Sequence, residues 1–208
     1  MVLPTSLSDD DRILVVDTST VINLNATGCT EEILKALPYR VAMVDTAADE
    51  IRDCGSRARN DASKFADLVR ANLIEVVTLD EGGLLLYEGL VIGAASETLD
   101  DGEAATIAFA ARINALAVID ERKALRLCAS RFPNVRLGST VDLFAHPAVQ
   151  RALGSTALAD AIHRALLDAR MRVLPHHLAG VLDLIGPVRA AQCPCLPRSV
   201  RERLTVSR

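Results

Sequence analysis

The sequence predicts an α/β fold, a three-layer α/β/α domain with a mostly parallel sheet followed by a C-terminal helical extension. Two observations support the domain. Short apolar runs that end in an aspartate recur, at 13–16 before Asp17, at 41–44 before Asp45 and at 116–119 before Asp120. Helical patterns separate these runs, and strands that alternate with helices favour a parallel sheet. A third observation supports the extension, because no strand pattern follows residue 147.

The individual elements follow from apolar runs, helix-starting residues and breakers. Strands are expected at 12–16, 41–44, 73–77, 116–119 and 135–137. Helices are expected through 21–24, after Thr30, after Thr46, over 57–71, 80–95 and 121–131, after Asp100 and Gly138, and over 155–170 and 176–185. Pro38, Gly55 and Pro133 mark helix ends, because proline and glycine interrupt helices.

Four segments are expected. Residues 1–11 should form a disordered leader, 12–146 the α/β domain, 147–185 the helical extension, and 186–208 a flexible tail. The tail is assigned from its prolines and arginines, because proline-containing chain ends are poorly ordered unless they are tied down.

The composition argues against several classes of protein. The net charge of −4 argues against a protein that coats nucleic acid, and 3% aromatic residues argue against base-stacking platforms. Five cysteines at irregular spacing fit a reduced, cytoplasmic protein better than a disulfide framework. The amino terminus lacks a secretory signal pattern, and the longest apolar segment, 84–95, contains Glu88 and is too short to span a bilayer.

Acidic residues at the predicted strand ends and on the following helices are the main functional signal. The candidates are Asp17, Glu50, Glu103 and Asp120, with Glu121 beside the last. Each could be a helix cap or a solvated side chain when taken alone. Gathered at one sheet edge, these carboxylates would repel one another unless a cation neutralised them. Mg²⁺ or Mn²⁺ suits oxygen ligands, and such ions promote phosphodiester hydrolysis.

These residues also carry a family resemblance. D-T-S at 17–19, Glu50 after the second strand, D-G-E-A at 101–104 and I-D-E-R-K at 119–123 resemble a PIN domain, notably the single-domain VapC-type toxins. The resemblance covers about residues 12–145. It implies a metal-dependent endoribonuclease that cleaves RNA with metal-activated water.

The resemblance also implies roles for individual residues. Asp17, Glu50 and Glu103 would be metal ligands, and Thr18 or Ser19 would support the first acid. Asp120 is the preferred fourth ligand because it ends a strand, and Glu121 is the alternative. Asn23 would orient the site.

Basic residues near the acids are candidates for phosphate contacts, namely Arg52, Arg57, Arg59, Arg122 and Lys123. The expected partners follow from the resemblance to the toxins. They are an RNA substrate, a possible antitoxin protein and a second copy of the chain in a homodimer, with no membrane.

Three alternatives stay open. The chain could be a non-catalytic PIN-like module that binds RNA or protein. It could be a haloacid-dehalogenase-like phosphatase, although that family needs a second acid where this chain has Ser19. A zinc site could also form from Cys193 and Cys195 with His176 and His177, although C-x-C spacing is atypical of zinc sites.

Overall fold

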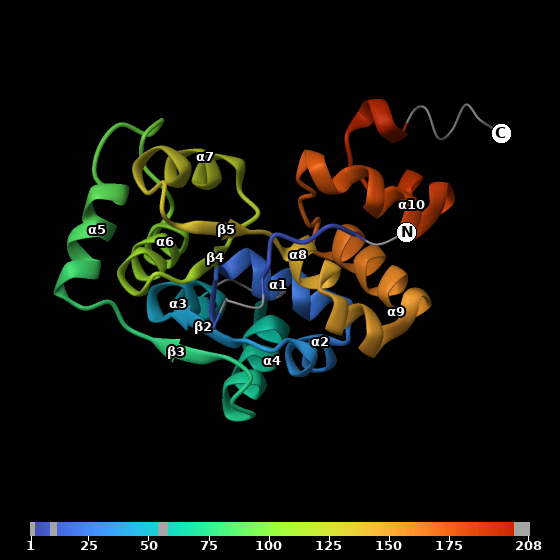
Figure 1. Ribbon diagram of the computed structural model, residues 1–208, viewed down its shortest axis with the longest axis horizontal. Helices are drawn as coiled ribbons and strands as arrows, with labels where there is room; N and C mark the ends of the chain where they lie inside the picture. The colour runs from blue at the N-terminus through green and yellow to red at the C-terminus, as the bar shows by residue number, and fades with distance from the viewer. Residues whose placement is uncertain (1–2, 9–11, 54–57, 202–208) are drawn as a thin grey trace.

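A five-stranded, all-parallel sheet forms the centre of the computed structural model, which describes residues 3–8, 12–53 and 58–201 (Figure 1). The strand order is β3-β2-β1-β4-β5. The strands are β1 (Ile13–Val16), β2 (Arg40–Val44), β3 (Glu75–Val77), β4 (Leu116–Val118) and β5 (Arg136–Gly138). This arrangement confirms the predicted three-layer α/β/α fold, and every strand pair is parallel.

Helices connect the strands and continue beyond the last one. In chain order they are α1 (Thr18–Thr27), α2 (Thr30–Ala36), α3 (Asp45–Asp53), α4 (Ala58–Arg70), α5 (Glu81–Val91), α6 (Asp101–Ile113), α7 (Arg122–Arg131), α8 (Thr140–Ala145), α9 (Pro147–Asp168) and α10 (Pro175–Ala191). Gly154 and Gly186 interrupt α9 and α10 with non-helical, positive-φ backbone.

The two faces of the sheet contact two separate hydrophobic cores. Successive residues of a strand point to opposite faces, so Leu14 and Val16 enter one core while Val15 enters the other. The first core also receives apolar residues of α1–α4 and α8–α10. The second receives those of α5, α6 and α7. Both faces are therefore covered, as an all-parallel sheet requires.

The direction in which strands are added to the sheet reverses between β1 and β4. From β1 the chain passes to β2 and β3 on one side, and then crosses to β4 and β5 on the other. Open α/β sheets bind ligands outside the carboxyl ends of strands at such a reversal. A functional site is therefore expected at the carboxyl ends of β1 and β4.

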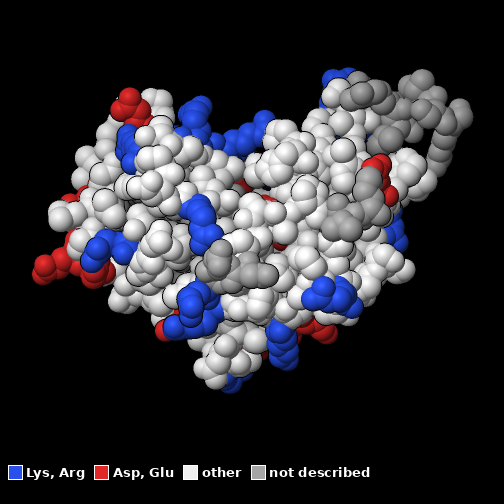
Figure 2. All heavy atoms as spheres, viewed as in Figure 1, with Lys and Arg blue, Asp and Glu red and all other residues white. Residues whose placement is uncertain are grey.

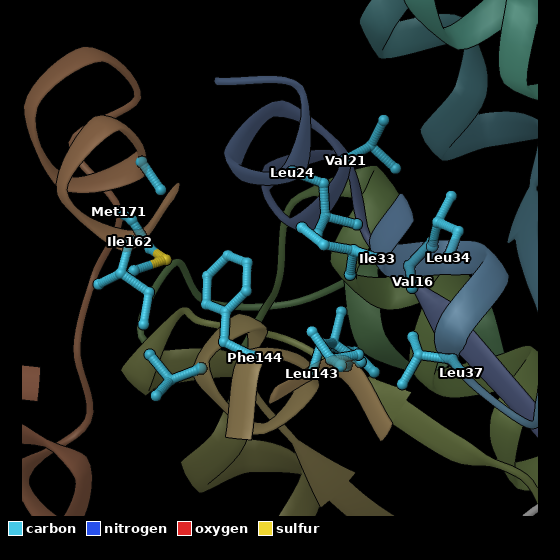
Figure 3. Packing of buried hydrophobic residues seen from close by; sticks show 14 of the residues in the cluster. Val16, Val21, Leu24, Ile33, Leu34, Leu37, Leu143, Phe144, Ile162 and Met171 are labelled. Atoms are coloured by element: carbon cyan, nitrogen blue, oxygen red, sulfur yellow. The ribbon is translucent and has the colours of Figure 1, made fainter. Parts of the chain in front are cut away.

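The C-terminal helices share the core of the domain. Ile162 of α9 and Met171 are fully or almost fully buried in the same cluster as Leu24 and Phe144. Figure 3 shows the Phe144 ring lying between Ile162 and Met171 on one side and Leu24 on the other. The segment after residue 147 is thus packed as part of the domain.

The chain ends differ from the sequence expectation. Leu3 and Leu7, in the expected disordered leader, are buried, as are Cys193, Leu196 and Val200 in the expected flexible tail. Apolar side chains that find a surface to cover become ordered even where local patterns are weak. Residues 3–8 and 186–201 therefore belong to the packed structure. No helix in the described part of the chain is long and apolar enough to cross a membrane.

Candidate metal and catalytic site

Asp17 follows β1 directly and begins α1. Its Oδ1 accepts a hydrogen bond from the backbone N–H of Thr20 at 2.7 Å, and its Oδ2 accepts one from the Ser19 hydroxyl at 2.7 Å. Capping a helix explains part of this arrangement. Burial nonetheless raises the pKa of Asp17, and the charge of Glu50 raises it further against the lowering effect of the Ser19 and Thr20 hydrogen bonds.

Asp120 lies two residues beyond β4, next to the end of β1. Its Oδ1 accepts from the Thr140 backbone N–H at 2.8 Å. Its Oδ2 accepts from the Thr140 hydroxyl at 2.6 Å and from Nδ2 of Asn23 at 2.8 Å. The donors fix the orientation of the carboxylate. Even so, burial and the charge of Asp17 raise the pKa of Asp120 to about 7.

Glu50 reaches the site from α3 and is held between two other helices. Its Oε2 lies 2.6 Å from the Thr18 hydroxyl, which also lies 3.0 Å from the Ala47 carbonyl oxygen. Its Oε1 accepts from the Gly102 backbone N–H at 2.7 Å. A Cβ atom on Gly102 would lie 2.6 Å from Oε2 of Glu50. Only glycine lets the first turn of α6 approach this carboxylate so closely.

Glu103 stands beside Gly102 in the first turn of α6 and is half-buried. Burial, followed by the charges of Asp17, Asp100 and Glu121, raises its pKa to about 7, against the opposing effect of the Asp100 backbone N–H. Asp17 thus acts electrostatically on both Glu103 and Asp120 and is itself affected by Glu50. Acids that raise the pKa values of neighbouring acids are typical of a site that binds a cation.

A pocket of about 260 Å³ opens onto Glu103 and Asp120, whereas Asp17 and Glu50 lie outside its lining. Ser19, Asn23, Glu103, Asp120 and Glu121 line one part of it, and the segment 169–172, between α9 and α10, lines the rest. Glu121 is at the edge, where it forms an ion pair with Arg172. Figure 2 shows acidic atoms within a hollow near the middle of this face, with Lys and Arg side chains above it.

The basic residues proposed from the sequence are less clearly placed. Arg52 pairs with Asp49 on its own helix and lies 6.0 Å from the centre of the Phe65 ring. The Lys123 ammonium donates to the Ala95 carbonyl, and Arg122 is exposed at the start of α7. Arg57 and the Arg59 side chain lie outside the described residues. Of the residues that the structure describes, Arg52, Arg122 and Lys123 do not line the pocket.

Sequence reasoning missed four residues of the site, Gly102 and Thr140 among the acids and Arg170 and Arg172 at the pocket wall. Thr140 could have been found, because it lies two residues beyond β5 as Asp120 lies two residues beyond β4. No local pattern marks the two arginines. Asp45, which ends β2 in the same way, instead accepts a hydrogen bond from its neighbour Thr46 and does not line the pocket.

The donor set of the pocket fits a hard divalent cation. Carboxylate, hydroxyl and amide oxygens are the ligands that Mg²⁺ and Mn²⁺ prefer, and the described residues that line the pocket include neither histidine nor cysteine. Within the described residues, no three of the acids bring ligand oxygens within 4.8 Å of one another. This spread suits an ion that keeps several water ligands.

A tighter group of possible ligands occurs elsewhere, at Asp142, His176 and His177. Asp142 already accepts hydrogen bonds from the backbone N–H and the hydroxyl of both Ser6 and Ser139, and Nε2 of His177 lies 3.1 Å from its Oδ2. Its carboxylate therefore has no free acceptor site for a metal ion. We therefore interpret this group as a set of hydrogen bonds that joins the N-terminal segment and α10 to α8, and not as a metal site.

The cysteines of the suggested zinc site do not join those histidines. The buried Cys193 thiol donates to the Arg189 carbonyl, and the Cys195 thiol donates to the Leu166 carbonyl. Neither belongs to the group formed by Asp142, His176 and His177 in the described part of the chain. Burial raises the pKa of both thiols, which disfavours the thiolate that zinc needs.

Comparisons with known proteins identify the family of the chain. A search among curated proteins found no match. A chain in the crystal structure of VapBC2 from Rickettsia felis, bound to a DNA fragment from the VapBC2 promoter, is similar with a TM-score of 0.41 and 16% identity; the match covers 61% of the present chain and 98% of that one. A family model described as a PIN domain matches residues 13–187, from β1 into α10. The chain therefore belongs to the PIN-domain family.

Proposed function

We propose that this protein is an endoribonuclease that depends on Mg²⁺ or Mn²⁺. The observation that carries the proposal is the group of acids near the carboxyl ends of β1 and β4 within a PIN domain, where the charge of Asp17 raises the pKa values of Glu103 and Asp120, and that of Glu50 raises the pKa of Asp17. Such mutual repulsion is relieved by a divalent cation, and hard cations at oxygen sites suit phosphodiester hydrolysis.

Asp17, Glu50, Glu103 and Asp120 would hold the metal, either directly or through water. We prefer Asp120 to Glu121 as the fourth ligand, because Asp120 is buried and oriented by Thr140 and Asn23 whereas Glu121 is paired with Arg172 at the pocket edge. A bound divalent ion would supply charge neutralisation and a water of lowered pKa.

The residues around the acids contribute orientation. Ser19 and Thr20 hold the Asp17 carboxylate, and Thr18 and Gly102 hold that of Glu50. Groups that orient metal ligands commonly affect activity 10- to 100-fold. The chain thus presents four acids, from two strand ends and two helices, in fixed directions.

We further propose a role as the toxin of a toxin–antitoxin pair, acting on RNA in the cytoplasm and assembling as a homodimer. The PIN-type arrangement of the acids supports this role. An induced copy should arrest growth, and coexpression of a small protein encoded beside it should restore growth. If no adjacent gene relieved the growth arrest, the protein could still be a nuclease, but it would not be the toxin of such a pair.

The decisive test is cleavage of a labelled mixed RNA with Mg²⁺ or Mn²⁺, beside EDTA and an Asp17→Asn variant. We expect cleavage that needs both the ion and Asp17. Asp45→Asn is a matched control, because Asp45 also follows a strand but hydrogen-bonds to its neighbour Thr46 and is not a main influence on the pKa values of Asp17, Glu103 or Asp120. It should cut at close to the wild-type rate.

Two results would contradict the proposal. Folded protein that binds RNA without cutting it, and that gains no thermal stability from Mg²⁺ or Mn²⁺, would be a binding module. Hydrolysis of a chromogenic phosphomonoester without RNA cleavage would favour the phosphatase alternative, which the Ser19 position argues against.

A further inference from the structure

One side of the acidic pocket is formed by basic residues, which the proposed metal site does not require. Arg170 and Arg172 line it together with Glu103 and Asp120, and both arginines come from the turn between α9 and α10. An RNA phosphate carries negative charge and is repelled by the same acids that hold a cation. Positive groups within the pocket would offset that repulsion.

The turn is anchored by the residue between the two arginines. Ala169 ends α9, Arg170 has a left-handed φ of 56°, and the Met171 backbone N–H then donates to the Ala165 carbonyl at 3.0 Å. Met171 is 1% exposed and packs in the core near Phe144 and Ile162 (Figure 3). The buried Met171 therefore fixes where the flanking arginines emerge.

Both guanidinium groups can be reached by a ligand. Arg170 is exposed and has no carboxylate ion-pair partner among the residues that the structure describes. Arg172 pairs with Glu121, but their side chains are 59% and 31% exposed. Such exposed pairs contribute little to stability, so Arg172 can exchange Glu121 for a phosphate at small cost.

We propose that Arg170 and Arg172 are positioning residues that bind phosphates of the RNA beside the acid site. The inference rests on the proposed nuclease function and names the surface that holds its substrate. Arginine suits this task because its planar guanidinium can bind two phosphate oxygens at once. The RNA backbone would then pass between the α9–α10 turn and the start of α7, over the hollow seen in Figure 2.

The test measures RNA binding apart from cleavage. In an Asp17→Asn background with Mg²⁺, a labelled single-stranded RNA is titrated at 50 to 200 mM salt and its anisotropy is followed. Replacing both arginines by glutamine should raise Kd about 10-fold or more and lower the salt slope by about 0.7 for each phosphate that is no longer neutralised, the value for single strands. In the active background, KM should rise while kcat changes only a few-fold. Arg172→Lys should retain part of the affinity.

Two further variants separate phosphate binding from a structural role. Arg189→Gln is a matched control, because Arg189 also forms a half-exposed ion pair, with Asp160, but does not line the pocket. It should leave Kd unchanged. If Arg172 served only to hold Glu121, then Glu121→Gln would weaken RNA binding as Arg172→Gln does. We expect Glu121→Gln to tighten it, since Arg172 is released and a negative charge is removed.

The outcomes distinguish this inference from the function on which it rests. Unchanged Kd, salt slope and KM in the arginine variants of an RNA-cleaving protein would overturn the inference alone. A parent protein that neither binds nor cuts RNA would overturn both.

Discussion

Asp120 and Asp142 are two buried aspartates in the same domain, and their surroundings give them opposite properties. Asp120 is 2% exposed and Asp142 is 1% exposed. Burial and the charge of Asp17 raise the pKa of Asp120 to about 7. At Asp142, burial also acts to raise the pKa, but hydrogen bonds from His177, Ser139 and Ser6 overcome it and hold the pKa well below its usual range.

The difference lies in what each carboxylate faces. Asp142 faces only donors, which come from the N-terminal segment, α8 and α10. Asp120 also accepts hydrogen bonds, yet it shares its surroundings with other acids. A buried carboxylate whose charge is fully compensated stabilises the fold. One whose charge is left uncompensated is available to a cation.

The largest expected effect is on activity at Asp120. Asp120→Asn removes the charge of a proposed metal ligand, so RNA cleavage should fall at least about 100-fold, beyond what loss of an orienting group usually causes. Without added metal its Tm at pH 8 should equal or exceed that of the wild type. Cleavage rates and thermal melts with EDTA test both halves. A marked fall in Tm would mean that Asp120 belongs with Asp142 as a stabilising residue.

Asp142→Asn should have the reverse outcome. Breaking a buried, fully paired carboxylate costs about 3–5 kcal/mol, and for a chain of this size each kcal/mol lowers Tm by roughly 2–4 °C. Urea denaturation measures the free energy of unfolding. Asp160→Asn removes an exposed partner of Arg189 and should cost at most about 1 kcal/mol. Equal losses in the two variants would remove the distinction between a buried and an exposed carboxylate.

The pH dependence of stability sharpens the same comparison. The folded pKa values of Asp120 and Glu103, about 7, exceed their ordinary values, so the folded state binds more protons between about pH 4 and pH 7. Stability from these groups is present at low pH and is lost as the pH rises through 7. Asp142 works in the opposite sense, and its contribution is complete above about pH 5 because its folded pKa is depressed.

Between pH 5 and pH 8 the metal-free wild type should therefore lose at least about 1 kcal/mol, since one pKa unit corresponds to about 1.4 kcal/mol. The free energy of unfolding with EDTA measures this loss. In Asp120→Asn the free energy of unfolding should decline less over this pH range. Adding Mg²⁺ to the wild type should restore its stability at pH 8. If the free energy of unfolding declined with pH equally in the wild type and in Asp120→Asn, Asp120 would ionise normally.

The smallest effect is expected at Gly102. In Gly102→Ala the new methyl would meet the Glu50 carboxylate, which must move. We expect cleavage to fall roughly 10-fold, as is usual for a group that orients a metal ligand, the role proposed for Glu50. Alanine favours helix by about 1 kcal/mol over glycine, so stability should change little. Gly89→Ala on α5, where a methyl meets nothing within 4 Å, is the control for propensity alone.

The sequence predicted the part of this molecule that depends on local patterns. Apolar runs that end in aspartate predicted β1, β4 and the placing of Asp17 and Asp120. Glu50 and Glu103 were candidates as acids on the helices that follow, and the PIN resemblance implied their role as ligands, because a helix face alone does not show which acid turns inward. Arg170 and Arg172 reach the pocket only because α9 and α10 pack on the domain, and no spacing records that contact.

The chain ends were mispredicted for a similar reason. Leu3 and Leu7 are isolated apolar residues without a helical or strand period, yet they find a surface formed much later in the chain. The tail was judged by its prolines, whereas Cys193, Leu196 and Val200 recur at intervals of three and four residues and could have indicated a packed face.

The contact between Ser6 and Asp142 has a consequence for the order of events during synthesis. The two residues are separated by 136 positions, and Leu3 lies against Gly180 still further along the chain. At roughly 5–20 residues per second, Ser6 leaves the ribosome on the order of ten seconds before its partner exists. The first residues of the described chain are thus among the last to reach their folded positions. Arg170 and Arg172 complete the lining of the pocket in the same late interval.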